Sequence, residues 1–168
     1  TVYNEADESL HSMDPATGYC EHECGTLLAV AKVDDTYHDD FATALTNWTD
    51  GTTLTLVTNI SDYDLSIEVT DGTKTLDLNG KTFTSTAWTI VSVGGTAKLT
   101  IQDSGTNGKM SGSGDGGSEA VVYVAEKATL RLDGGEFIGE CALRNAGTSY
   151  VGENVKIGDD CIIHPNAV

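Results

Sequence analysis

The side chains that could transfer a proton or bind a cation are charged residues at the polar positions of short apolar–polar–apolar steps. Asp77 lies in TLDL and Arg131 in TLRL, so both are predicted to face away from the core. The matching outward column is predicted to read Thr55, Asp77, Thr100, Arg131 and Lys156. Asp77 and Arg131 are two steps apart in it, whereas acid–base catalysis needs groups within hydrogen-bond reach. The sequence therefore names no catalytic residue and favours a protein that is not an enzyme.

Two other sets of residues are candidates for ligand binding. Trp88 and Tyr123 are predicted to lie on equivalent faces of neighbouring repeats, where aromatic rings could stack on sugar rings. Asp103, Asp115 and Glu119 frame a glycine-rich run, and their carboxylates could offer oxygen ligands to Ca²⁺. No Asp-x-Asp-x-Asp-Gly spacing accompanies them, and a flexible loop is the alternative. The sequence therefore implies no cofactor and no metal ligands, and it leaves Ca²⁺ open.

The four cysteines leave several pairings open. Cys20 and Cys24 flank His22 in the run CEHEC, which could be a local disulfide, a pair of free thiols or a metal site. On an extended strand these side chains lie about 6.5 Å apart, too far for one zinc ion, and a disulfide needs Cα atoms within about 7 Å. Cys141 and Cys161 do not share a repeat position and are predicted to be buried thiols. The even number of cysteines favours an oxidising compartment.

A repeated strand-and-corner motif must position these side chains. TLDLNGKTF, from Thr75, recurs as KLTIQDSG from Lys98, as TLRLDGGEF from Thr129 and more loosely as NVKIGDDCI from Asn154. Its second apolar residues predict one column, made of Leu56, Leu78, Ile101, Leu132 and Ile157. Alternation sends six aliphatic residues inward: Leu76, Leu78, Leu99, Ile101, Leu130 and Leu132. Each repeat therefore contributes a strand to a stack of parallel strands.

Three further alignments fix the rest of each repeat. Val91 is predicted to lie over Val122, and Met110 in the inner column of Phe83 and Phe137. A corner column of Asn79, Gln102 and Asp133 is predicted to form a hydrogen-bonded polar ladder. Asn-Gly and Gly-Gly pairs at residues 79–80, 94–95 and 134–135 suit corners that need a positive φ.

This pattern resembles the pectate-lyase-like right-handed parallel β-helix, in particular repeat modules of large surface proteins of Gram-positive bacteria, over roughly Tyr37 to Gly158. The resemblance implies an all-β solenoid at the cell surface or outside the cell, with a structural or adhesive role. Polysaccharide lyases and hydrolases of that fold need several carboxylates on adjacent repeats. The predicted outward column with Asp77 and Arg131 lacks them. The alternative function is a β-helix that binds or cleaves a glycan, and a host or cell-surface protein is a further partner to consider.

The chain is expected to contain three parts. Residues 1–36 form an N-terminal extension with Cys20, Cys24 and a first strand, and residues 37–50 form a capping helix. Phe41, Leu45 and Trp48 have helical spacing in DDFATALTNW, with Asp39 or Asp40 as N-cap. Residues 51–168 form a β-solenoid of about four to five coils.

The last 18 residues carry a second resemblance. VGENVK, IGDDCI and IHPNAV, from Val151, are similar to the hexapeptide repeat of left-handed β-helix acyltransferases, in which His164 would be the general base. An acyltransferase fragment is therefore the third hypothesis. The unfinished C-terminal coil is expected to expose Ile162, Ile163 and Val168, which could stack copies end to end into a homo-oligomer or a filament.

Charge restricts the partners. The net charge of −17 reflects 26 acidic residues against nine Lys and Arg, and phosphate binding depends on those basic residues, so nucleic acid is excluded. No apolar run approaches the roughly 18 residues of a membrane span, so membrane insertion is not expected. No basic-plus-apolar leader opens the chain, which is expected to be cytoplasmic or to have lost a signal. The cysteines and the resemblance favour an extracellular or cell-surface location.

Overall fold

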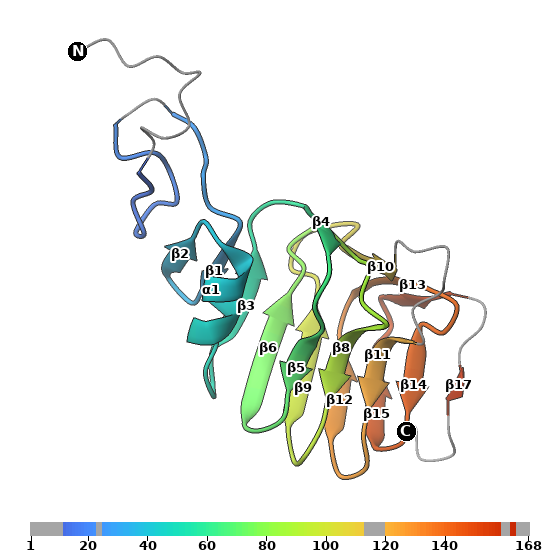
Figure 1. The fold of residues 1–168 in the computed structure, drawn as a ribbon. Helices are drawn as coiled ribbons and strands as arrows, with labels where there is room; N and C mark the ends of the chain where they lie inside the picture. Colours follow the sequence, from blue (N-terminus) through green and yellow to red (C-terminus); the bar gives the residue numbers. More distant parts are fainter. Residues whose placement is uncertain (1–11, 23–24, 113–119, 159–161, 164–168) are drawn as a thin grey trace.

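The fold is mostly β, with parallel sheets and one helix in the part of the chain that the structure describes (Figure 1). The structure, a computed structural model, describes residues 12–22, 25–112, 120–158 and 162–163. Strands are short, at two to five residues each, because a corner follows almost every one of them. The sheets around these corners define where polar side chains can gather.

The strands belong to three sheets. The first has the order β15-β12-β9-β6-β3-β1-β2 and contains β1 (Ala31–Val33), β2 (Thr36–His38), β3 (Thr53–Leu56), β6 (Thr73–Asp77), β9 (Lys98–Gln102), β12 (Thr129–Leu132) and β15 (Thr148–Val151). The second contains β4 (Ile60–Tyr63), β7 (Thr82–Ser85), β10 (Lys109–Gly112), β13 (Gly135–Ile138) and β16 (Val155–Ile157). The third contains β5 (Ile67–Val69), β8 (Thr89–Val93), β11 (Ala120–Val124), β14 (Leu143–Asn145) and β17 (Ile162–Ile163).

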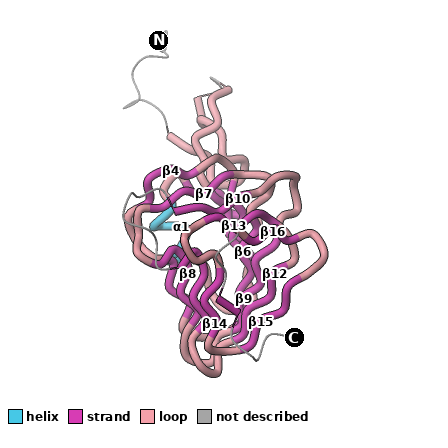
Figure 2. The backbone as a smooth tube through the Cα atoms, turned by 90° about the vertical axis from the view of Figure 1, so that its right-hand side faces the viewer, coloured by secondary structure: helices cyan, strands magenta, loops and turns pink. Residues whose placement is uncertain are grey.

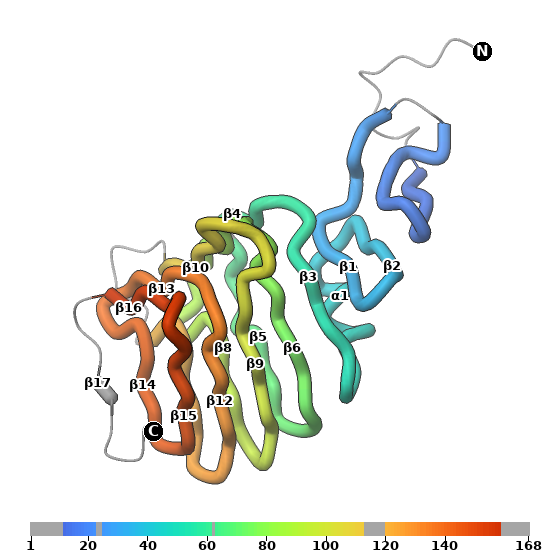
Figure 3. The backbone as a smooth tube through the Cα atoms, turned by 180° about the vertical axis from the view of Figure 1, so that it is seen from behind, coloured from blue at the N-terminus to red at the C-terminus, as the bar shows by residue number. Residues whose placement is uncertain are grey.

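From β3 onward each strand pairs, in parallel, with the strand three places further along the chain. The chain therefore visits the three sheets in turn and returns to the first; one such passage is called a rung below. Figure 2 shows the three sheets around a common interior, and Figure 3 shows the first sheet's strands stacked side by side.

Ladders of apolar side chains fill this interior. Leu54, Leu76, Ile101 and Leu132 pair one after another across the first sheet, and each is at most 1% exposed. All six aliphatic residues predicted to face inward are buried. Burial of one such side chain contributes about 1.5–3 kcal/mol, so stacking of successive rungs stabilises the fold.

The inner columns of the other two sheets were predicted correctly. Met110 pairs with Phe83 on one side and with Phe137 on the other, and all three are at most 1% exposed. Val91 pairs with Val122 in the third sheet. The brief strand around Met110 is β10.

The predicted register of the first sheet is wrong at two steps. Leu76 pairs with Ile101, although Leu78 was predicted to do so. Ile157 lies in the second sheet, where it pairs with Phe137, and it is not a member of the first column at all. The first error is a shift of two residues, which keeps the same faces inward because side chains alternate with a period of two.

The helix and two antiparallel strands cover the N-terminal end of the sheets. β1 pairs antiparallel with β3 and with β2, so the hairpin straddles the boundary predicted at residue 36. The helix α1 spans Phe41–Asn47, within the predicted 37–50. Its N-cap is Asp40, whose Oδ2 accepts a hydrogen bond from Thr43 N at 2.8 Å.

Aromatic packing joins this helix to the core. The Phe41 ring lies 5.1 Å from the Tyr63 ring and 5.4 Å from the Phe83 ring, measured between centroids. Trp48, just after the helix, is 3% exposed, as expected of a residue that contacts the core. The helix therefore belongs to the same hydrophobic core as the strands.

Candidate functional site

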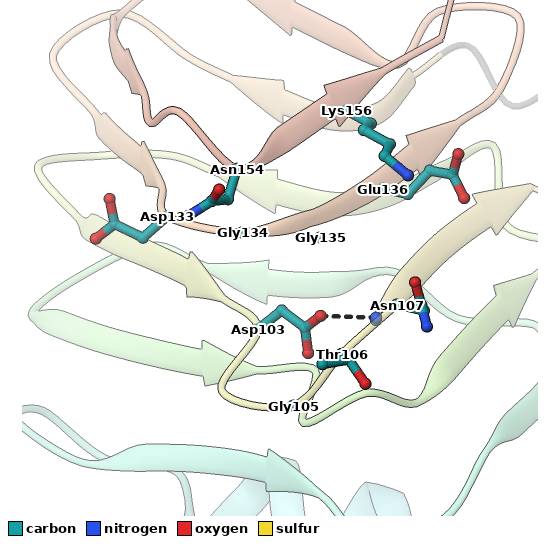
Figure 4. Close-up of a pocket in the computed structure, with 11 residues that line it drawn as sticks. Asp103, Gly105, Thr106, Asn107, Asp133, Gly134, Gly135, Glu136, Asn154 and Lys156 are labelled. Atoms are coloured by element: carbon teal, nitrogen blue, oxygen red, sulfur yellow. Dashed lines mark hydrogen bonds between the residues drawn. The ribbon is translucent and has the colours of Figure 1, made fainter.

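A groove runs along the corners that connect the first sheet to the second. It is formed by the loops after β9, β12 and β15 and has a volume of about 340 Å³ (Figure 4). This groove, called the corner groove below, is lined by Asp103, Gly105, Thr106, Asn107, Gly108, Asp133, Gly134, Gly135, Glu136, Asn154 and Lys156. Its size falls in the range of small-molecule sites, but no aromatic side chain lines it.

The carboxylate of Asp103 holds the backbone at the floor of this groove. Its Oδ1 accepts a hydrogen bond from Gly80 N at 2.6 Å, and its Oδ2 accepts one from Gly108 N at 2.7 Å. A Cβ on Gly108 would lie 2.6 Å from the Asp103 carboxyl carbon, so any larger residue there would displace this carboxylate. Asp103, predicted as a ligand for Ca²⁺, therefore uses both oxygens to bind two corners of its own chain.

Asp77 is a buried carboxylate one rung away. It is 5% exposed; its Oδ1 accepts hydrogen bonds from Asn79 N at 2.9 Å and Ser104 N at 3.0 Å, and its Oδ2 accepts one from Gln102 Nε2 at 3.0 Å. Burial acts to raise the pKa of Asp77, but the hydrogen bonds from Ser104, Gln102 and Asn79 outweigh it and leave the pKa below its usual value. Asp77 is therefore ionised and fully engaged by its own chain.

The two carboxylates link neighbouring corners reciprocally. Asp77, before the Asn79-Gly80 corner, accepts from Ser104 N on the next rung, while Asp103 beside Ser104 accepts from Gly80 N in return. The predicted polar ladder of Asn79, Gln102 and Asp133 is wrong in its first member. Gln102 pairs with Asp77, and Asn79 donates from Nδ2 to Leu56 O instead.

The predicted outward column is confirmed for Thr55 with Asp77 and for Thr100 with Arg131, but it is wrong at the step from Asp77 to Thr100 and at Lys156. Arg131 pairs with Thr100 and Tyr150, in the column Thr53, Thr75, Thr100, Arg131 and Tyr150. Asp77 belongs to the neighbouring column with Thr55 and Gln102, and Lys156 pairs with Glu136 in the second sheet. Asp77 and Arg131 are therefore not brought together, because the two-residue shift in register moves Asp77 by one column.

Arg131 has a local partner instead. Its Nε lies 2.5 Å from Asp133 Oδ2, and the hydrogen bond to Asp133 raises the pKa of Arg131 above its usual value. The Arg131 side chain is 58% exposed, so this ion pair is screened by solvent and contributes little to stability.

The two aromatic candidates are separate. Trp88 is 64% exposed and Tyr123 is half-buried. Tyr123 pairs with Ser92, which lies four residues after Trp88. The backbones of Trp88 and Tyr123 are therefore about 13 Å apart along the strand direction. Tyr123 lines a pocket of about 400 Å³ with Thr89, Ala120 and Arg144, and Trp88 does not line it.

Several predicted site residues lie outside the described residues. They are Cys24, Asp115, Glu119, Cys161, His164 and Val168. Cys20 is buried, and Cys141 is half-buried although it was predicted to be buried. Ile162 and Ile163 form β17, whose backbone pairs with β14 at the edge of the third sheet. Within the described ranges, no group of three or more His, Cys, Asp or Glu side chains could hold a metal ion.

Sequence reasoning missed the corner groove itself. Glu136 lies in β13, Lys156 in β16 and Asn154 directly before β16, and this recurrence of polar residues where the second sheet begins was the available signal. The signal was hidden because the lengths of the connecting segments differ between rungs, so that the corners do not align by simple counting.

Comparison of the chain with protein families, with curated proteins and with solved structures found no match. The only helix among the described residues is too short to cross a membrane.

Proposed function

We propose that this chain is a right-handed parallel β-helix module with a structural, non-catalytic role outside the cell, as a rigid acidic spacer or an adhesive surface. The observation that carries the proposal is the use of corner side chains: their oxygens accept hydrogen bonds from backbone N–H groups of adjacent segments. The pairs are Asp34 with Thr53 N, Asp50 with Thr73 N, Asn59 with Thr82 N, Asp77 with Ser104 N and Asp103 with Gly80 N. Polar side chains that could have bound a ligand or transferred a proton thus stabilise the backbone of the corners.

Surface charge supports the same role. A net charge of −17 keeps molecules of this kind apart, which protects the many strand edges of such a fold from sideways association. The cysteines and the resemblance to surface-protein modules support the extracellular or cell-surface location.

The two ends of the module differ in a way that matters for self-association. At the N-terminal end, β1 and β2 extend the first sheet, and Tyr37 N on β2 donates to Pro15 O at 2.8 Å. This backbone group is already paired and cannot receive another chain. We propose that end-to-end assembly into a homo-oligomer involves the segment around Ile162 and Ile163 rather than this edge of β2.

Small-angle X-ray scattering with size-exclusion chromatography and light scattering tests the proposal. We expect an elongated, rigid particle, and a mass that is a multiple of the monomer mass would support end-to-end assembly. Incubation with a panel of neutral and acidic polysaccharides, followed by a reducing-end assay, is expected to release no products. Depolymerisation of any of these polysaccharides would overturn the non-catalytic role.

A glycan-binding or glycan-cleaving β-helix is the second candidate, and the corner groove is the observation that favours it. Carboxylate, amide and ammonium groups at its rim, among them Glu136, Asn154 and Lys156, match the hydrogen-bonding needs of sugar hydroxyls. Glycan-array binding of the wild type, compared with Glu136→Ala and with the exposed control Glu126→Ala, tests it. Binding lost only in Glu136→Ala would favour this candidate, and absence of binding to the array would reject it.

A further inference from the structure

The same tripeptide, Asn-Gly-Lys, occurs at two corners of the chain. Residues 79–81 connect β6 to β7, and residues 107–109 lead into β10. Glycine after asparagine leaves its backbone nitrogen unhindered, since there is no Cβ to obstruct the approach of the asparagine side chain. That nitrogen can attack the asparagine Cγ. Because the local sequences match, any difference in reactivity between the two copies must come from tertiary structure.

Both glycine nitrogens donate to one carboxylate. Gly80 N bonds to Asp103 Oδ1 and Gly108 N to Asp103 Oδ2, at 2.6 and 2.7 Å, and Figure 4 shows the second of these bonds. The proton that a glycine nitrogen must lose to become a nucleophile therefore already points at a proton acceptor. The corresponding glycine nitrogens share this feature, so Asp103 alone does not distinguish the two copies.

The two asparagine side chains have different freedom. Asn79 is half-buried and its Nδ2 donates to Leu56 O at 3.0 Å, which restrains the side-chain amide. Asn107 is exposed, and its side chain makes no hydrogen bond to other described residues. The φ angles of the two asparagines are similar, 48° at Asn79 and 64° at Asn107, but of the two glycines that follow only Gly80 has a positive φ, of 70°. Side-chain restraint therefore distinguishes the two asparagines.

We infer that Asn107 is a site of spontaneous, intramolecular modification, while Asn79 is protected. Gly108 N forms a bond to Asn107 Cγ as its proton passes to the Asp103 carboxylate. The bond from Cγ to Nδ2 then breaks, and the leaving nitrogen takes up that proton and departs as ammonia. Water opens the resulting cyclic imide at either carbonyl, which yields aspartate or isoaspartate at position 107.

The products change the corner groove, because Asn107 and Gly108 both line it. Either product adds a carboxylate to a rim that already contains Asp133 and Glu136, and so makes the groove more negative. Isoaspartate also adds a methylene group to the backbone between Asp103 and β10, which lengthens the loop that the bond from Gly108 N to Asp103 closes. The fraction of modified Asn107 would therefore increase with the age of the folded protein.

Peptide mapping by mass spectrometry over time tests the inference on the intact chain. We expect the two asparagines to convert at similar rates in concentrated urea, since their tripeptides are identical. In native buffer we expect Asn107 to convert about tenfold faster than Asn79 or more, because one hydrogen bond must first break at Asn79. Equal native rates, or faster conversion at Asn79, would overturn the inference.

Two further measurements test the part assigned to Asp103. Asn107 is expected to convert faster in the native chain than in urea, and a slower native rate would show that the fold protects this site and would overturn the inference. Asp103→Asn keeps the side-chain shape but removes the proton acceptor, so the native rate at Asn107 should fall toward the urea value. Asn107→Gln serves as the control, with the same circular dichroism spectrum and no conversion at position 107.

Discussion

Replacement of Asp77 by alanine tests whether carboxylates at the corners stabilise this fold. Asp77 is 5% exposed and accepts three hydrogen bonds, two of them from the backbone N–H groups of Asn79 and Ser104. Alanine leaves both N–H groups without their acceptor at a corner where two rungs meet. The chain should therefore lose stability without losing any apolar contact of the interior.

The size of the effect follows from those bonds. An unsatisfied buried N–H group costs about 1–3 kcal/mol, and the lower half of this range applies because Ser104 is exposed and water can reach its N–H group. The lost bond from Gln102 adds about 1 kcal/mol, which is offset by relief of the cost of burying a charge. We expect the free energy of unfolding to fall by about 2–3 kcal/mol.

Urea unfolding followed by fluorescence of the buried Trp48 measures this change. Asp71→Ala is the matched control: Asp71 is an exposed corner aspartate without a hydrogen bond to the described residues, and its loss should cost less than about 0.5 kcal/mol. If Asp77→Ala is as mild as Asp71→Ala, the corner carboxylates do not stabilise the fold and the reasoning fails.

Three further predictions concern the core, the acid response and the exposed ion pair. Met110→Ala, in the stack of buried residues of the second sheet, should cost about 2–5 kcal/mol in urea unfolding, and a cost below about 1 kcal/mol would contradict the packing. The pKa of Asp77 and of Asp40 is lowered in the folded chain, for Asp40 by hydrogen bonds from Thr43, so both stabilise the fold above the ordinary aspartate pKa. Thermal unfolding at a series of pH values should show this stability lost as the pH falls below about 4, and an unchanged melting temperature there would contradict it. Arg131→Ala should leave the urea midpoint close to that of the wild type, since its ion pair is exposed, and a clear drop of the midpoint in the same assay would show that the ion pair is structural.

Much of the fold could be predicted from local pattern. Alternation identified the inward residues, and the strand around Met110 was found because its neighbours Phe83 and Phe137 repeat the same apolar position. The helix was found from the spacing of Phe41 and Trp48 and from its N-cap aspartate. These features depend on a few consecutive residues, which the sequence contains in full.

The candidate site could be predicted only in part. Asp77 and Arg131 were correctly placed on the outer side of the first sheet, but they do not share a column. A shift of two residues preserves which face each side chain occupies and changes every neighbour across strands. Asp103 was predicted to be an oxygen ligand for a cation. Its carboxylate instead accepts hydrogen bonds from Gly80 N and Gly108 N, which lie on corners that only the stacking of rungs brings together.

The sequence by itself determined which side chains of the repeated strands face inward and where the Asn-Gly corners lie, because alternation and the preference of Asn-Gly for tight corners are local properties. Only the tertiary structure decided which corners face each other, and hence that one carboxylate, Asp103, binds the glycine nitrogens of both Asn-Gly pairs. The physical reason is that connecting segments of unequal length separate the rungs. Their register is therefore set by backbone pairing and core packing between residues far apart in the chain.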